Sequence, residues 1–182
     1  MKTDLSKYDN SWYDPGRGFI KRTFWFIVNA IFFQCPLNPF SSLKVALLKL
    51  FGAKIGKGVC IKPSVNIKYP WRLKIGNNVW VGESVWIDNL ADVMIEDNVC
   101  ISQGAMLLCG NHNYKKETFD LMIGEIIVKE GAWIGARAVV CPGVIVNAGA
   151  VLTVSSVATK DLDANSIYQG IPAVKIRIIN RI

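Results

Sequence analysis

Residues 95–107, IEDNVCISQGAML, decide the fold, because an aliphatic side chain recurs there at every sixth position: Ile95, Ile101 and Leu107. The same six-residue period extends back to residue 55 and resumes at residue 128. A small or β-branched residue stands four places after most of these aliphatic residues, and Gly or Asn often stands three places after them. The other aliphatic positions are Ile55, Ile61, Ile67, Ile75, Val81, Ile87, Val128, Ile134, Val140, Val146 and Leu152.

A period of six argues against the common alternatives for an apolar sequence. An amphipathic helix needs apolar residues three and four positions apart, and an ordinary parallel sheet needs crossover helices, which this sequence lacks. Each unit is instead expected to be a short strand followed by a tight corner, where Gly or Asn accepts a positive φ. Three units would close one coil, and successive coils would pair about 4.8 Å apart. This hexapeptide repeat predicts a mainly β fold, a left-handed parallel β-helix over residues 55–174.

Three interruptions of the period are expected to lie on one corner of the resulting prism. The spacing lengthens to eight residues after Ile67 and after Ile87, and to twenty-one after Leu107. Each interruption follows the third unit of a coil, so the inserted segments should stack on one another and form a cleft. They comprise residues 69–72, residues 88–92 and a long loop over residues 109–126.

The sequence outside the repeat divides into a front extension, residues 1–54, and a tail, residues 175–182. Apolar residues between Phe19 and Phe32 predict one helix, and Leu43–Phe51 predicts a shorter second one. These helices are expected to cap the open end of the prism, which would otherwise expose unpaired strand groups. Contact with a membrane surface is the alternative, and the two are compatible. The tail alternates apolar and charged residues and is expected to pack along the last coil.

The composition indicates an ordered globular protein with a basic front end. Of 182 residues, 51% are hydrophobic and 19% are charged, a balance that excludes a disordered chain. Residues 1–54 hold eight Lys and Arg against three acids, so they carry +5 of the formal charge of +7. Such a charge suits anionic lipid or an acidic glycan. Nucleic acid is not an expected partner, because no basic run and no nucleic-acid-binding motif occurs.

Residues at the amino terminus predict neither secretion nor a membrane span. Residues 1–14 are polar with three acids, unlike a signal peptide. The apolar stretch Thr23–Phe33 covers about half of the roughly 20 residues that a span requires. The five cysteines are odd in number and lack CxxC spacing, which indicates reduced thiols. These features predict a cytoplasmic protein, with peripheral contact at the inner membrane as an option.

His112 is the only histidine and lies at the root of the long loop, in the stretch LLCGNHNY at residues 107–114. Acyl transfer to a hydroxyl needs a base that is neutral near pH 7 and can hold a proton briefly, which suits imidazole. A polar loop residue satisfied by the backbone is the simpler explanation for a lone histidine. The position of His112 beside the bulged corner favours the catalytic role.

With these features the chain resembles the hexapeptide-repeat acetyltransferases. The likeness includes the repeats, the Asn111-His112 site after the third coil, and the carboxyl-terminal motifs VATKD at residues 157–161 and GIPA at residues 170–173. Three segments make it more similar to the acetyltransferases of colanic acid and related exopolysaccharide biosynthesis. They are ALLKLFGAKIG at residues 46–56, YPWRL at residues 69–73 and ISQGA at residues 101–105.

The resemblance implies a homotrimer with each active site between two subunits. His112 would take the proton from a saccharide hydroxyl, whose oxygen attacks the thioester of acetyl-CoA without an acyl-enzyme. The backbone N–H of Ala136 would hold the oxyanion, an interaction worth about 3 kcal/mol. Lys160 and Arg177 would neutralise phosphates of coenzyme A, although a solvated rim is the simpler interpretation. The positions that match the family's coenzyme A groove are Trp133, Ala136, Val154, Thr159, Lys160 and Arg177.

The acceptor contacts are less well defined than the base. The galactoside-type enzymes carry an acceptor-binding Asn at a position where this chain has Gly82. Asp88 and Asp92 are expected one coil below His112, where they would orient its ring or bind a sugar. The alternative is that both are solvent-exposed acids without a role in the site. The expected acceptor-binding set is Glu83, Asp88, Asn89 and Asp92.

Other chemistries and functions are weaker matches to the sequence. No metal is expected to be required, since the related γ-class carbonic anhydrases need three histidines on this scaffold. Cys109 is expected to be a structural thiol, because no second base lies near it in the pattern. A small-molecule acetyltransferase acting on serine, an amino sugar or an antibiotic stays open, as does a non-catalytic β-helix scaffold. A scaffold would need neither His112, nor the long loop, nor the Thr159-Lys160 pair.

Overall fold

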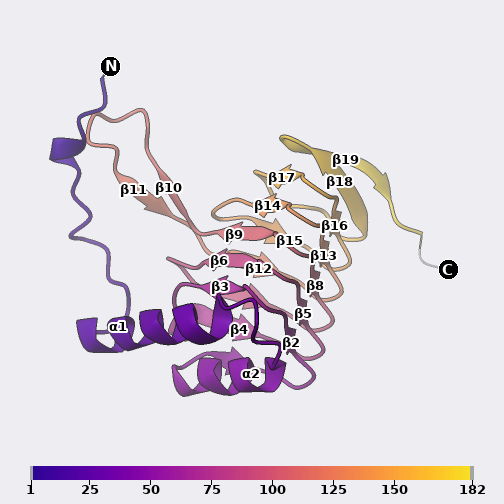
Figure 1. Ribbon diagram of the computed structural model, residues 1–182. Coiled ribbons are helices and arrows are strands. Elements are labelled where there is room, and N and C mark those ends of the chain that lie inside the picture. The colour runs from indigo at the N-terminus through magenta and orange to yellow at the C-terminus, as the bar shows by residue number, and fades with distance from the viewer. Residues whose placement is uncertain (1, 181–182) are drawn as a thin grey trace.

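The computed structural model describes residues 2–180 and shows parallel strands wound around one core (Figure 1). The first sheet has the order β1 (Lys54–Ile55), β4 (Leu73–Ile75), β7 (Val93–Ile95), β12 (Ile126–Val128) and β15 (Ile145–Val146). The second has the order β19 (Ala173–Ile178), β18 (Ser166–Gly170), β16 (Val151–Leu152), β13 (Trp133–Ile134), β8 (Cys100–Ile101), β5 (Trp80–Val81) and β2 (Cys60–Ile61). The third has the order β17 (Val157–Ala158), β14 (Val139–Val140), β9 (Met106–Leu108), β6 (Trp86–Asp88) and β3 (Asn66–Ile67).

Consecutive repeat strands belong to different sheets, so the chain visits all three sheets in each coil. Within each sheet the equivalent strands of successive coils pair in parallel, for example Ile75 with Ile95 and Val81 with Ile101. This arrangement is a three-sided parallel β-helix. The fold predicted from the six-residue period is therefore confirmed.

The aliphatic position of each unit forms the core of the prism. From Ile61 to Leu152 the predicted inward side chains are at most 4% exposed, and Ile55 in the first strand is partly exposed. Full burial of such a side chain contributes about 1.5–3 kcal/mol, so this column of aliphatic side chains is the main stabilising feature. The predicted corners have positive φ angles between 55° and 82°, at Gly58, Asn78, Asn98, Gly104, Gly131, Gly143 and Gly149.

Two helices cover the amino-terminal end of the prism (Figure 1). A short 3-10 turn, η1 (Leu5–Lys7), precedes α1 (Phe19–Val28), which continues as the π-helical turn η2 (Asn29–Phe33) and is followed by α2 (Ser41–Leu50). Trp25 anchors α1, because its indole Nε1 donates a 2.8 Å hydrogen bond to the Ile67 carbonyl. α2 buries Lys44, whose Nζ donates to the carbonyls of Asn38 and Lys62, both at 2.9 Å. Burial lowers the pKa of Lys44.

At the other end of the prism, β18 and β19 form an antiparallel hairpin beside the last coil. β19 spans residues 173–178, so the boundary expected after residue 174 falls inside this strand. The expected tail also includes residues 181 and 182, which lie outside the described residues. Between residues 2 and 180, no helix combines the length and apolar character needed to cross a bilayer.

Candidate active site

The expected long loop is a two-stranded ribbon that projects from the corner between the third and first sheets (Figure 1). β10 (Gly110–His112) pairs antiparallel with β11 (Leu121–Ile123), and His112 lies opposite Leu121. The root of the ribbon is closed by the Gly124 N–H, which donates to the Cys109 carbonyl at 2.9 Å. Burial raises the pKa of Cys109 to about 12, so this residue is a neutral thiol at pH 7 and not a nucleophile.

The ribbon holds the ring of His112 in one orientation and one tautomer. The Nδ1 atom lies 3.0 Å from the carbonyl oxygen of Phe119. Because a carbonyl only accepts, Nδ1 carries the proton in this contact and the neutral ring presents an unprotonated Nε2. The imidazole stacks on the Phe119 ring, with 4.4 Å between centroids and 4° between planes. Tyr8 contacts it from another side, with centroids 5.6 Å apart.

The inserted segments stack on the corner below His112, as the spacing predicts. A 3-10 turn, η3 (Pro70–Arg72), fills the first insertion. Lys68 Nζ lies 2.9 Å from Asp88 Oδ1, an ion pair whose angles fall outside hydrogen-bond geometry. Arg72 Nη1 lies 3.5 Å from Asp92 Oδ1. Both carboxylates thus face basic side chains of the coil before them, and the orientation of His112 comes from the Phe119 carbonyl.

Of the two remaining residues of the expected acceptor set, Asn89 is buried within this corner and Glu83 lies on another corner. Asn89 is fully buried, and its amide accepts from the Tyr69 N–H at 2.9 Å and donates to the Tyr69 carbonyl at 2.6 Å. Its side chain therefore holds two insertions together and presents no polar atom to an acceptor. Glu83 is exposed on the corner between the second and third sheets, one sheet away from the His112 corner.

The amino-terminal segment, residues 4–16, forms a strap over this corner that the sequence did not reveal. At the tip of the ribbon, the Asp4 N–H donates to the Glu117 carbonyl at 2.9 Å. The ammonium of Lys7 lies 2.7 Å from the Glu117 carboxylate. The strap therefore ties the loop that carries His112 to the start of the chain.

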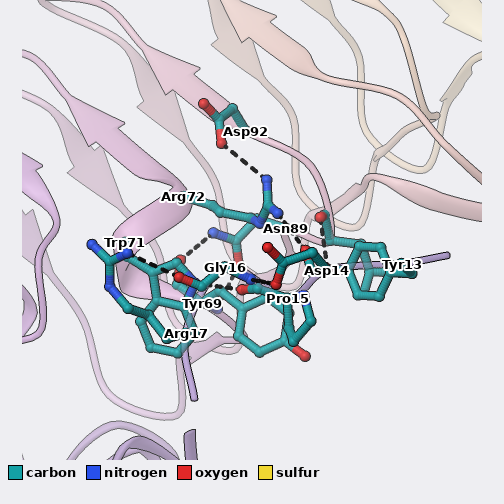
Figure 2. Close-up of polar contacts among 11 residues, drawn as sticks. Tyr13, Asp14, Pro15, Gly16, Arg17, Tyr69, Trp71, Arg72, Asn89 and Asp92 are labelled. Atoms are coloured by element: carbon teal, nitrogen blue, oxygen red, sulfur yellow. Dashed lines mark hydrogen bonds and ion pairs between the residues drawn. The ribbon is translucent and has the colours of Figure 1, made fainter. Parts of the chain in front are cut away.

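Further along, the strap is fixed to the inserted segments (Figure 2). The Tyr13 hydroxyl donates to the Leu90 carbonyl at 2.8 Å, and burial raises the pKa of this phenol. Trp71 Nε1 donates to the Pro15 carbonyl at 2.7 Å. Arg72, which pairs with Asp92, also donates to the Asp14 carbonyl at 2.6 Å. These bonds give the strap a defined path across the corner.

A cavity of about 580 Å³ opens between the strap, the ribbon and the prism. His112 and Leu121 line it from the ribbon, and Tyr69 lines it from the prism. The strap and α1 supply the other side of its wall, including Tyr8, Asn10, Ser11, Tyr13 and Arg22. His112 is thus placed in a concave, largely polar site of a size suited to a small substrate.

The expected coenzyme A residues occupy three places on the prism. Trp133 and Arg177 lie on the outer face of the second sheet, joined through the pairs Trp133–Val151, Val151–Ile167 and Ile167–Arg177. Val154 adjoins Ala136 at the corner that follows, where the Ser155 N–H donates to the Ala136 carbonyl at 2.9 Å. Thr159 and Lys160 are exposed at the end of β17, on the same corner as His112.

Ala136 occupies the second position of a tight turn over residues 135–138. The Ala138 N–H donates to the Gly135 carbonyl at 3.1 Å, and Arg137 has a φ of 56°. This is the pattern of a type II turn. The N–H of Ala136 has no backbone acceptor within residues 2–180, so it is available to a negatively charged oxygen.

Comparison with known proteins assigns this architecture to a family. WcaF of Escherichia coli (strain K12), provisionally named as a colanic acid biosynthesis acetyltransferase, is 37% identical over 174 residues, 96% of both chains. The chain belongs to the hexapeptide-repeat acetyltransferases. No model of a protein family matches it. The predictions of the family and of an acyltransferase are confirmed.

Two solved structures extend the comparison. A galactoside acetyltransferase in complex with coenzyme A is 25% identical, with a TM-score of 0.77 over 88% of this chain and 82% of that one. The hexapeptide-repeat acetyltransferase VCA0836 of Vibrio cholerae O1 biovar eltor, complexed with acetyl coenzyme A, has a TM-score of 0.80 over 92% and 93% of the two chains. It is 19% identical, so that likeness concerns the fold.

Proposed function

We propose that this acyltransferase moves an acetyl group from acetyl-CoA to a hydroxyl of a saccharide, an exopolysaccharide precursor, with His112 as the general base. The observation that carries the proposal is the Nδ1 contact of His112 with the Phe119 carbonyl at 3.0 Å. It leaves Nε2 free to accept a proton inside a cavity large enough for a sugar. The name of WcaF supports a saccharide acceptor, and the galactoside acetyltransferase complex supports coenzyme A as carrier.

The chemistry is a direct transfer in two steps. Nε2 of His112 takes the hydroxyl proton while the acceptor oxygen bonds to the thioester carbon, and the carbonyl oxygen becomes an oxyanion. The N–H of Ala136 donates to that oxyanion. The C–S bond then breaks, the carbonyl re-forms, and the sulfur takes the proton from the imidazolium. The products are an acetyl ester and coenzyme A, and His112 is neutral again.

This reaction requires two copies of the chain. His112 projects from the corner between the third and first sheets, whereas Ala136 lies between β13 and β14, at the corner between the second and third sheets. Within one chain the width of the third sheet separates them. A homotrimer with His112 from one subunit and Ala136 from the next would bring them together. The outer faces of the second and third sheets support such packing, because they expose Trp80, Trp86, Met106 and Trp133 by 37–49%.

In this trimer, coenzyme A would lie along the interface. Trp133, Val154 and Arg177 come from the faces near Ala136, and Thr159 and Lys160 come from the corner near His112. Lys160 and Arg177 are exposed, and both are free to meet phosphate groups. No metal has a role in this mechanism.

We also propose that the enzyme works in the cytoplasm at the inner membrane surface. Helix α1 exposes large apolar side chains on its outer side, including Phe19 at 73%, Ile20 at 72% and Phe26 at 70%. Arg17 and Lys21 stand beside them, and the front extension is basic. An apolar face bordered by cations suits the surface of an anionic bilayer.

The function is tested by acetyl-CoA turnover against a panel of oligosaccharides, sugar phosphates, amino sugars and serine. Turnover that depends on a saccharide, with an O-acetyl ester as product, is the expected result. Turnover on serine alone would overturn the saccharide assignment. Turnover with none of them would overturn the proposed acceptor class.

A further inference from the structure

Arg22 is a cation in the cavity of His112, and no ion pair joins it to a carboxylate of residues 2–180. It lies in the second turn of α1 and is half-buried. Its Nε is buried and has no hydrogen-bond partner within residues 2–180. The ion pairs of this corner join Lys68 to Asp88 and Arg72 to Asp92, so neither satisfies Arg22. A partly desolvated guanidinium costs free energy unless an anion meets it.

Arg22 lies where two cavities adjoin. Together with Lys68 and Tyr69 it lines both the 580 Å³ cavity of His112 and a second cavity of about 340 Å³. The second cavity runs past Phe26 on the outer side of α1. At the junction Arg22 and Lys68 carry two positive charges and Asp88 carries one negative charge, so the net charge is +1. A substrate spanning both cavities would thus place its middle against a net positive charge.

We propose that Arg22 and Lys68 bind a phosphate or diphosphate of the acceptor, so the acceptor is a phosphate-linked saccharide and not a free neutral sugar. This inference rests on the proposed function and specifies its acceptor. The sugar occupies the cavity beside His112, and the phosphate lies at the junction. Arg22 is suited to this task, since a guanidinium donates to two phosphate oxygens at once. Both a nucleoside diphosphate sugar and a prenyl diphosphate sugar carry this group.

The test compares Arg22→Gln with Arg17→Gln on a water-soluble nucleoside diphosphate sugar without membranes, where Arg17, whose guanidinium donates to the neighbouring Gly16 carbonyl, is a matched control. For a diphosphate-linked saccharide, Arg22→Gln should lower kcat/KM about 10- to 100-fold, the effect of one charge-assisted hydrogen bond. The loss of kcat/KM for a neutral saccharide should be several-fold smaller, because such an acceptor has no phosphate to meet the guanidinium. Arg22→Lys should recover part of the loss, which also controls for misfolding. An equal loss on both acceptors would overturn the proposal.

Inorganic pyrophosphate provides a second, direct measurement. It should inhibit the wild-type enzyme competitively against the saccharide and inhibit Arg22→Gln less. Inhibition competitive against acetyl-CoA alone would place the anion in the coenzyme site and overturn the proposal.

If the wild type acetylated no saccharide, the proposed function would fail. Calorimetry of pyrophosphate binding to the wild type and to Arg22→Gln would still test the anion site. Weaker binding to Arg22→Gln than to the wild type would support the site, and equal binding would overturn it.

Parallel assays with the two acceptors distinguish the source of the phosphate. A higher kcat/KM for the prenyl diphosphate sugar would indicate that the cavity along α1 receives the lipid. A higher kcat/KM for the nucleoside diphosphate sugar would indicate a water-borne acceptor. Either result is consistent with the phosphate site, whereas equal activity on both and on the neutral saccharide contradicts it.

Discussion

The imidazole of His112 and the side chain of Phe119 stack in parallel, while the Nδ1 atom of the first residue lies 3.0 Å from the carbonyl oxygen of the second. Phe119 therefore sets both the plane of the ring and the location of its proton. A carboxylate usually performs the second task in enzymes that use a histidine base. Here a backbone carbonyl does so, and it adds no negative charge to the site.

Replacing the proposed base, His112, should remove the chemical step and leave the fold intact. His112→Ala is expected to lower kcat about 10²- to 10⁴-fold, the usual contribution of general base catalysis. His112 lies on a projecting ribbon outside the column of core side chains, so the thermal midpoint should stay within a few degrees. Steady-state turnover and thermal unfolding measure the two effects. Normal turnover by this variant would show that another group takes the proton.

Removing the stacking partner should affect rate more than affinity. Phe119→Ala keeps the backbone carbonyl but frees the imidazole to tilt, so kcat should fall about 10- to 100-fold because the near-attack geometry is lost. The KM for acetyl-CoA should not change. Tyr114→Ala is a matched control, since Tyr114 lies in the same loop and is 74% exposed. Equal losses in both variants would indicate a general effect on the loop and not on the ring.

Changes in the strap should affect the KM for the acceptor and not the KM for acetyl-CoA. Tyr8 contacts the His112 ring and lines the cavity, so Tyr8→Ala should raise the KM for the acceptor several-fold. The KM for acetyl-CoA should stay constant, because none of the proposed coenzyme A residues lines the cavity that Tyr8 lines. Tyr13→Phe is expected to cost about 1 kcal/mol of stability by losing the bond to the Leu90 carbonyl. A raised KM for acetyl-CoA in Tyr8→Ala would contradict this division.

The fold was predictable because the repeat is a local pattern that recurs. Each aliphatic residue, such as Ile101 or Val140, specifies the inward face of its own unit, and the period specifies the coil. The corners were only partly predictable. Ser64, Ser84, Arg137 and Ser155 have φ angles of 54–58°, the same conformation as the Gly and Asn corners. The pairing of adjacent coils imposes this conformation on residues that do not prefer it.

The site was less predictable, because much of it is made by contacts between distant segments. His112 was a candidate from its residue type and its place in the repeat, and the structure places it in a cavity. The role of the Phe119 carbonyl was not predictable, because every residue has a backbone carbonyl and the residue type does not indicate which one accepts a hydrogen bond. The strap has no periodicity, and its bonds span large sequence separations, such as 77 residues from Tyr13 to Leu90. Arg22 also gave no signal, because its lack of an anionic partner depends on where α1 packs.

The core column should be sensitive to cavities. Ile101 is fully buried and paired in register with Val81 and Ile134, so its neighbours on both sides are fixed by strand pairing. Ile101→Ala should lower the free energy of unfolding by about 2–5 kcal/mol, and Ile101→Val by about 0.5–1.5 kcal/mol. Denaturant unfolding of both variants measures the difference. A loss below 1 kcal/mol for Ile101→Ala would mean that the coils collapse around the cavity.

The proposed oxyanion donor, the N–H of Ala136, can be removed without disturbing its turn. Proline lacks an N–H and is favoured at the second position of a type II turn, the position of Ala136. The chain itself has proline there in two other corners, Pro63 before Ser64 and Pro142 before Gly143, whose φ angles are 58° and 82°. Ala136→Pro should therefore fold normally and lower kcat about 10²- to 10³-fold. Unchanged turnover would exclude this N–H from the reaction.

Mixing the two inactive variants tests whether the site lies between subunits. In trimers assembled from equal amounts of His112→Ala and Ala136→Pro chains, about one quarter of the interfaces would join an intact His112 to an intact Ala136. Activity should thus return to about one quarter of the wild-type value after the chains are unfolded and refolded together. At each interface, the subunit that supplies His112 and the subunit that supplies Ala136 each carry the intact residue with a probability of about one half. Refolding each variant alone is the control and should restore nothing. If the mixture also stayed inactive while both variants formed trimers, His112 and Ala136 could not act on the same substrate from neighbouring subunits.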